Sequence, residues 1–270
     1  MPTPFICSTC GVQFAPSEHP PAHCPICADE RQYVNAAGQR WTTPDDLRAG
    51  HQTNWRELEP GLFGIGATPQ IAIGQRALFL PQPGGGVMWD STPLVTDEAV
   101  DRIRAIGGLR AIAISHPHFH AAMVEWSEAL DGVPIYIHAD NADYVMRPSA
   151  AIRLWRGETL DLGGDLTLIR CGGHFEGSAV LHWPQGAAGT GTLFTGDTIM
   201  VTADTRWLSF MRSYPIYIPL NRAAVDRIVA AVAPFAFERI YGAQWGQVCQ
   251  VEARKRLKRS AARYLLAIAD

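Results

Sequence analysis

The chain has little of the features that mark membrane or nucleic-acid-binding proteins. Its apolar runs are short, as in IVAAVA at 228–233, and fall far below the ~20 residues that a helix needs to cross a bilayer. The formal net charge is only −3, which disfavours a nucleic-acid partner. The first residues, MPTPFICSTCG, show no basic region followed by an apolar stretch, as a secretory signal would. We therefore expect a cytoplasmic protein that makes no membrane contact.

Cysteine is scarce except near the N-terminus. Four of the six cysteines form two CxxC pairs there: Cys7, Cys10, Cys24 and Cys27. This spacing is typical of four thiolates that surround one tetrahedral ion. Structural zinc fits best, and rubredoxin-like iron is an alternative because rubredoxins carry similar pairs, although farther apart. Disulfides are a further alternative, disfavoured in a chain without an export signal. We predict a zinc-ribbon-like metal knuckle over residues 1–35.

For the rest of the chain we predict a connector over 36–55, with a short helix at 44–49, and one α/β domain over 56–270. Short apolar segments predict strands at 61–66, 70–74, 76–80, 87–89, 110–115, 134–138, 166–170, 178–183, 192–195 and 239–241. Helical periodicity, with caps such as Thr96 and Asn221, predicts helices at 97–106, 121–130, 222–233 and 249–268. Early hairpins followed by alternating strands and helices predict two sheets with helices outside.

Histidine is concentrated in SHPHFHA at 115–121, which contains His116, His118 and His120. The motif lies between a predicted strand and a predicted helix, in a loop of the kind that often carries active-site ligands. A His-x-His pair in an extended segment can chelate one ion. His174 lies in the glycine-rich GGHFEGS, and Asp197 ends the strand of TLFTGD. IYGAQWG at 240–246 follows a further strand.

In order and spacing, these pieces resemble the metallo-β-lactamase superfamily, whose pattern is HxHxDH, a GH loop, a strand ending in GD, and a final GH. The resemblance covers roughly residues 56–270. It implies a four-layer αβ/βα sandwich preceded by the tetracysteine zinc knuckle. It also implies that His116, His118 and His174 bind a first metal ion, that Asp197 completes or bridges the site, and that Asp90 in VMWD steadies the metal-binding loop.

The chain departs from the family pattern at three positions. His120 stands in place of the motif aspartate, Ala121 replaces the last histidine of HxHxDH, and YGAQWG lacks the final histidine, with Gln244 as its nearest polar side chain. Because Ala121 cannot bind metal and an amide is a poor zinc ligand, we expect one ion, with a pair assisted by His120 as the alternative. His120 is expected to be either a ligand or a general acid and base.

The resulting prediction is a metal-dependent hydrolase that acts on a small-molecule ester, thioester, lactone or amide. Zinc is favoured in the active site and iron stays open. The alternatives are an iron-dependent oxidoreductase, sulfur dioxygenase-like or diiron, and a non-catalytic binding protein. The aromatic segment 200–220 could line a substrate pocket, with Arg206, Trp207, Arg212 and Tyr214 as the pocket residues. The alternative is a loop that packs on the domain or on a second copy in a homo-oligomer.

Overall fold

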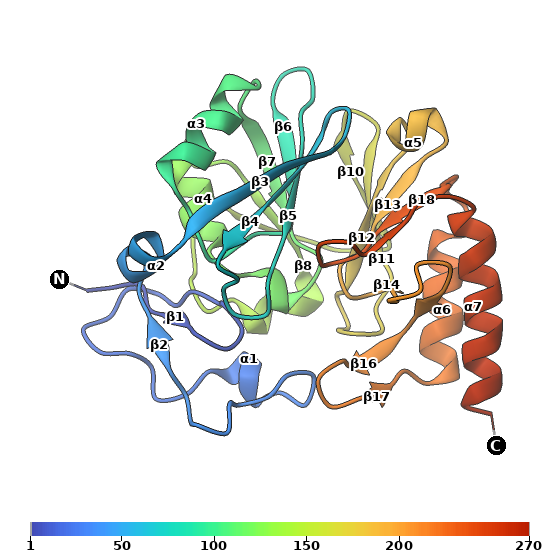
Figure 1. Cartoon of the computed structure of the whole chain (residues 1–270), viewed down its shortest axis with the longest axis horizontal. Helices are drawn as coiled ribbons and strands as arrows, with labels where there is room; N and C mark the ends of the chain where they lie inside the picture. The colour runs from blue at the N-terminus through green and yellow to red at the C-terminus, as the bar shows by residue number, and fades with distance from the viewer. Residues whose placement is uncertain (1, 270) are drawn as a thin grey trace. The chain divides into compact units, whose positions relative to one another are not determined.

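A computed structural model describes residues 2–269, and the chain divides into two compact units (Figure 1). The first comprises Met1–Ile137 and Ala142–Leu154, and the second comprises His138–Asn141 and Trp155–Asp270. Each unit is built around one large β-sheet, of seven strands in the first and six in the second.

The first unit begins with residues 2–50, which we call the tetracysteine module. Its elements are β1 (Ile6–Cys7), α1 (Pro25–Ala28), β2 (Trp41–Thr42) and α2 (Pro44–Gly50), with β1 and β2 paired antiparallel. Helix α2 begins at a capping box, in which the Thr43 hydroxyl accepts from the backbone N–H of Asp46 and the Asp46 carboxylate accepts from that of Thr43. The short helix predicted at 44–49 is therefore present.

The seven-stranded sheet of the first unit runs in sequence order, β3-β4-β5-β6-β7-β8-β9. Its strands are β3 (Gln52–Glu59), β4 (Leu62–Thr68), β5 (Ala77–Leu80), β6 (Gly86–Trp89), β7 (Leu109–Ala113), β8 (Ile135–His138) and β9 (Ile152–Trp155). Strands β3 to β6 pair antiparallel, whereas β6, β7 and β8 pair parallel. The parallel strands require crossover connections, and the connection from β7 to β8 carries the three histidines.

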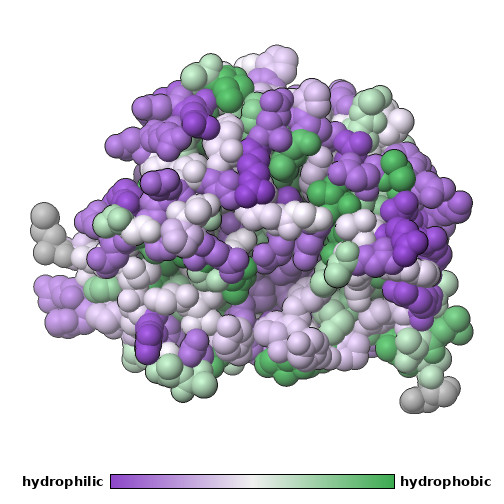
Figure 2. All heavy atoms as spheres, viewed as in Figure 1, coloured by the Kyte–Doolittle hydropathy of each residue, from purple (hydrophilic) through white to green (hydrophobic). Residues whose placement is uncertain are grey.

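Four helical segments accompany this sheet: α3 (Asp97–Ala105), η1 (Pro117–Phe119), α4 (Met123–Ala129) and η2 (Ala139–Tyr144). Helix α3 is capped by the Thr96 hydroxyl, which also lies 2.6 Å from the hydroxyl of Thr53 on β3. It buries Ala99, Val100 and Ile103 and leaves its charged side chains in solvent, so hydrophilic residues predominate around α3 in Figure 2.

The second unit contains the six-stranded sheet, in the order β10-β11-β12-β13-β18-β19. Its strands are β10 (Thr159–Gly163), β11 (Leu166–Arg170), β12 (Ala179–Trp183), β13 (Thr192–Phe194), β18 (Arg239–Tyr241) and β19 (Val248–Cys249). Two small hairpins follow β13: β14 (Met200–Val201) with β15 (Leu208–Ser209), and β16 (Met211–Ser213) with β17 (Ile218–Pro219).

The helices of the second unit are α5 (Gly186–Gly189), α6 (Arg222–Val232) and α7 (Ala253–Ala267), and α6 and α7 run side by side (Figure 1). Their apolar faces share one buried cluster with the sheet, which includes Ile228 of α6, Leu257 of α7 and Ile240 of β18. Within residues 2–269 there is no helix long and apolar enough to cross a membrane.

One predicted strand is wrong. Residues 70–74 form a turn, closed by a hydrogen bond from the Gly74 N–H to the Ile71 carbonyl, and Ala72 has a φ of 48°. The apolar character that suggested a strand has another cause, since Ile71 packs against Ile6 and Leu47 of the tetracysteine module. The last helix also begins later than predicted, because Cys249 belongs to β19.

Candidate metal centres

The four cysteines of the tetracysteine module form one buried cluster whose sulfur atoms all lie within 4.8 Å of one another. Cys7 Sγ is 3.5 Å from Cys27 Sγ, and Cys10 Sγ is 3.7 Å from Cys24 Sγ. Zinc–thiolate bonds of about 2.3 Å in a tetrahedron place neighbouring sulfur atoms roughly 3.8 Å apart. The cluster therefore fits a tetracysteine metal knuckle, and the disulfide alternative fails because all four cysteines are free.

Hydrogen bonds within the cluster lower the pKa of two of its cysteines, Cys7 and Cys24. Hydrogen bonds from Cys10, Cys24 and Cys27 lower the pKa of Cys7 far below its ordinary value. The side-chain amide of Gln39 donates to Cys7 Sγ at 3.2 Å, which adds a donor outside the cluster. Amide donors next to the sulfur atoms are a common form of support for metal-binding cysteines.

The histidine loop, residues 115–121, is buried along its whole length. Strand β7 delivers the chain to Ser115, η1 contains His118, and α4 follows directly. The His116 and His118 rings lie 5.1 Å apart, centroid to centroid. Nδ1 of His116 lies 2.8 Å from the Ser115 hydroxyl, which fixes the orientation of the ring.

His120 has a separate environment in the same loop. Its Nδ1 lies 2.9 Å from the Tyr144 carbonyl, so Nδ1 carries the proton and Nε2 keeps a lone pair. Nε2 is buried and has no hydrogen-bond partner within residues 2–269. Burial lowers the pKa of His120 to about 4, which keeps the ring neutral near neutral pH. The side chain can therefore accept a proton or bind a metal ion through Nε2.

The backbone of the histidine loop is held from the neighbouring strand β6. Asp90, just after β6, accepts a hydrogen bond from the Ser115 N–H at 2.8 Å through its carboxylate. The next hydroxyl, Ser91, donates to the carbonyls of Phe119 and His120. These contacts fix both ends of the loop. Ser91 escaped the sequence analysis because a serine beside a strand carries no distinctive pattern.

In the second unit, His174 lies in the glycine-rich loop after β11 and is fully buried. Its Nδ1 lies 3.2 Å from the Met211 carbonyl, so Nε2 is the nitrogen that could bind a metal ion. Gly173, with a φ of 84°, precedes it, and a Cβ at this position would lie 2.8 Å from Cδ1 of Ile228. The glycine is required by both the left-handed backbone and the close approach of α6.

Asp197 follows β13 in the same unit, and the backbone around it is tied to Tyr214. The Tyr214 hydroxyl donates to the Asp197 carbonyl at 2.7 Å, and its ring lies 5.7 Å from the His174 ring. Burial raises the pKa of Tyr214 well above its ordinary value, so the hydroxyl stays protonated and acts as a donor. The second unit thus brings together His174, Asp197 and one of the predicted pocket residues.

The other predicted pocket residues have different surroundings. Arg206 forms an exposed ion pair with Asp204, and Trp207 lies beneath the guanidinium groups of Arg259 and Arg263 on α7. For Trp207, the contact with α7 favours the alternative prediction, in which the segment 200–220 packs on its own domain. Arg212 lies half-buried on β16, and a pocket role for it stays a prediction. Gln244 lies between β18 and β19, where its N–H donates to the Gln247 side chain.

Two cysteines outside the module are buried. Burial raises the pKa of Cys171 to about 12, and it also raises the pKa of Cys249. Thiols that remain protonated in an apolar core are unreactive. The interpretation of Cys171 and Cys249 as structural thiols is the one that their surroundings favour.

Comparison with solved structures identifies the fold. The chain is similar to the metallo-β-lactamase from Pontibacter korlensis, with a TM-score of 0.57 and 16% identity over 81% of this chain and all of that one. It is also similar to the FIM-1 metallo-β-lactamase of Pseudomonas aeruginosa in a mono-zinc form, with a TM-score of 0.59 and 14% identity over 80% of this chain and 97% of that one. A third is the DIM-1 metallo-β-lactamase, with a TM-score of 0.59 and 15% identity over 80% and 98%. The chain has the metallo-β-lactamase fold, as the sequence predicted.

A curated relative then gives the family. The chain is 46% identical over 266 residues to YmaE of Bacillus subtilis (strain 168), an uncharacterized protein, and the match covers 98% of this chain and 96% of YmaE. The chain belongs to the family of YmaE. No protein-family model matches it.

Proposed function

We propose that the protein is a metal-dependent hydrolase with one active-site ion, bound by His116, His118, His174 and Asp197. The donor set supports this, because three imidazoles and one carboxylate can hold a single ion. The observation that carries the proposal is the orientation of His174, whose Nδ1 faces the Met211 carbonyl, as in histidines that bind metal through Nε2. The chemistry such an ion supplies when bound is activation of water and polarisation of a substrate carbonyl.

The side chains that stand where the family pattern has the ligands of a second metal ion support a site with a single ion. Ala121 has no donor atom, and the amide of Gln244 is a weak ligand for zinc. A second ion would therefore depend on Asp197 and His120 alone. FIM-1, a protein of the same fold, has been crystallised in a mono-zinc form, which supports an arrangement with one ion.

We infer that His120 moves protons in this site. Its neutral ring has one nitrogen turned to the Tyr144 carbonyl and the other unpaired within the described residues. Such a ring can take a proton from the attacking water and return it to the leaving group. If His120 instead bound metal, Nε2 would be committed to the ion and proton transfer would need another group.

The substrate class that fits is a small molecule with a hydrolysable carbonyl: an ester, thioester, lactone or amide. The β-lactamases of the same fold are below 25% identical, so they inform the fold and not the substrate. Zinc is the ion we propose in both centres. Iron in the histidine site would instead favour the oxidoreductase alternative.

Elemental analysis tests the proposed centre. The purified parent is expected to hold two zinc ions per chain, one in the cysteine cluster and one in the histidine site. His174→Ala should hold one and lose at least 100-fold in hydrolysis of a panel of aryl esters, thioesters and lactones, because one of four ligands is missing. His51→Ala is the matched control, since His51 lies outside the proposed ligand set and its ring hydrogen-bonds to the Leu47 carbonyl of its own helix. Two zinc ions retained in His174→Ala would overturn the ligand assignment.

A further inference from the structure

The tetracysteine module and the histidine loop meet at the side chain of Gln75, which lies between β4 and β5 and is 3% exposed. Its Nε2 donates to the carbonyl of Cys10 at 2.6 Å and to the carbonyl of His118 at 3.1 Å. One buried amide group therefore connects the backbone of a cysteine in the first cluster to the backbone of a proposed ligand in the second.

The carbonyl oxygen of the Gln75 side chain is in an unfavourable environment. Within residues 2–269, Oε1 of Gln75 is buried without a hydrogen-bond partner. A buried unpaired acceptor is destabilising and rare, so stability alone would favour another side chain here. We therefore attribute the presence of glutamine at this position to its two side-chain N–H groups, which donate to Cys10 and His118.

Close approach of the module to Gln75 requires a glycine. Gly11 follows Cys10 with a φ of 79°, and a Cβ on it would lie 2.9 Å from Nε2 of Gln75 and 2.7 Å from Cγ of Pro93. The same glycine donates its N–H to the Cys7 carbonyl, which closes the first cysteine turn. The turn that presents the thiolates is thus also the surface that meets Gln75.

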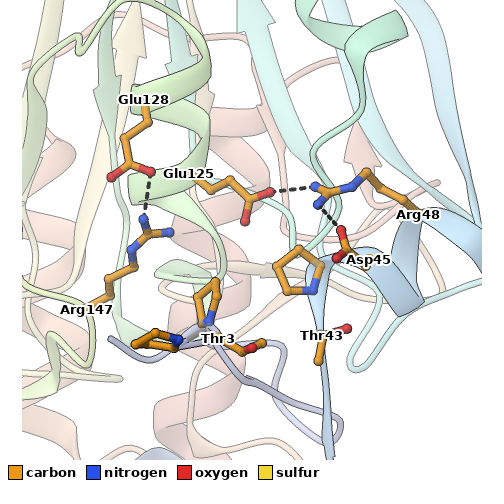
Figure 3. Close-up of a pocket in the computed structure, with 10 residues that line it drawn as sticks. Thr3, Thr43, Asp45, Arg48, Glu125, Glu128 and Arg147 are labelled. Carbon is orange, nitrogen blue, oxygen red and sulfur yellow. Dashed lines mark hydrogen bonds and ion pairs between the residues drawn. The ribbon is translucent and has the colours of Figure 1, made fainter. Parts of the chain in front are cut away.

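The module holds the other end of the histidine loop as well. The Gln13 N–H donates to the Ala121 carbonyl at 3.0 Å, and the Gln13 side chain donates to Glu125 on α4. A pocket lies beside these contacts, and two ion pairs line it: Arg48 of α2 with Glu125, and Arg147 with Glu128 (Figure 3). Exposed ion pairs contribute little individually, so on this side of the loop the hydrogen bonds from Gln13 and Gln75 matter most, in addition to those from Asp90 and Ser91 on the other side.

We propose that the tetracysteine module is the scaffold of the histidine loop, with Gln75 as the positioning residue that transmits the geometry of the cysteine cluster to His118. This inference rests on the proposed function, since it concerns the affinity of the histidine site for its ion. With the cluster intact, Gln75 keeps the His118 backbone where its imidazole can bind. When Gln75 loses its donors, the loop relaxes and the histidine site binds its ion more weakly, although no ligand is changed.

The experiment compares the zinc-loaded parent with Gln75→Met, a side chain of similar length without donors. Gln70→Met is the matched control, because Gln70 is an exposed glutamine of the same segment. Each protein is titrated with a zinc chelator. Elemental analysis counts the ions that remain, and reaction of the thiols with a disulfide reagent reports separately on the cysteine cluster.

We expect Gln75→Met to release the histidine-site ion at a chelator concentration at least tenfold lower than the parent, while thiol protection is unchanged. Gln70→Met should follow the parent. Release at the parental concentration would overturn the coupling and leave the proposed function standing. A parent that holds only the thiol-protected ion would overturn the proposed metal centre, and the coupling with it. If thiols of Gln75→Met react without chelator, Gln75→Ser, which leaves room for water beside both carbonyls, is tested by the same criterion.

Discussion

At the scale of single residues, His120 differs from the other histidines of its loop. His116 is oriented by the adjacent Ser115 hydroxyl, whereas His120 is oriented by the carbonyl of Tyr144, 24 residues further along the chain. Both contacts set which nitrogen carries the proton. His116 belongs to the group of side chains that could hold the ion, whereas His120 does not, which is why we assign proton transfer to His120.

Replacement of His120 by alanine separates its two possible roles. If the ring moves protons, His120→Ala should lose roughly 100-fold or more in kcat, in line with the usual contribution of general acid–base catalysis. Its zinc content should stay at the parental two ions per chain. Turnover and elemental analysis are measured on the same preparation, with His51→Ala as the control. Loss of zinc from His120→Ala would instead identify His120 as a ligand.

At the scale of elements, the predicted and observed structures differ mainly at sheet edges. Strand β3 was not predicted because it is an edge strand whose sequence, QTNWRELE, has no apolar run, and every residue of it retains some exposure. The central strands β5, β6 and β7 were predicted because their buried residues form short apolar runs. Helices α3 and α6 were predicted almost to the residue because Thr96 and Asn221 cap them.

The loop that carries His174 depends on how closely it approaches α6. Gly173→Ala would place a Cβ 2.8 Å from Ile228 and 3.0 Å from Leu220, in addition to the strain of a left-handed backbone. Strain and overpacking together should lower the free energy of unfolding by about 2–4 kcal/mol. Chemical denaturation measures the loss.

Gly189→Ala isolates the packing contribution. Gly189 has the same φ of 84° and no atom within 4 Å of an added Cβ, so only the backbone strain applies there. The loss in Gly189→Ala should be the smaller of the two by roughly 1 kcal/mol or more. Equal losses would mean that contact with α6 does not constrain the loop.

At the scale of the whole molecule, the tetracysteine module provides little core of its own. Its buried apolar residues outside the cysteines are few, and Ile6 and Leu47 bury their side chains against Ile71 and Leu94. So small a module cannot supply its own folding free energy, which must come from metal binding and from docking on the sheet.

Removal of the cysteine-bound ion should therefore destabilise the protein as a whole. Structural zinc contributes several kcal/mol or more to folding, so a chelator that empties the cluster is expected to lower Tm by on the order of 10 °C. Differential scanning calorimetry measures the shift, and elemental analysis verifies that the ion has left. His174→Ala under the same treatment attributes the shift to the cluster. An unchanged Tm after verified removal would show that docking alone folds the module.

The sequence by itself determined the residue types and the local spacings of both metal centres. The CxxC pairs and the HxH motif each lie within a few residues, so their donor types and spacing can be recognised in the sequence alone, although His118 lies in the 3-10 turn η1 and not in the extended segment considered for a His-x-His pair. Only the tertiary structure decided that Gln75 connects Cys10 to His118 and that Tyr144 turns His120, because these partners lie 24 to 65 residues apart in the chain. A lone glutamine in a turn has no pattern, and its role exists only when folding brings two carbonyls to one amide.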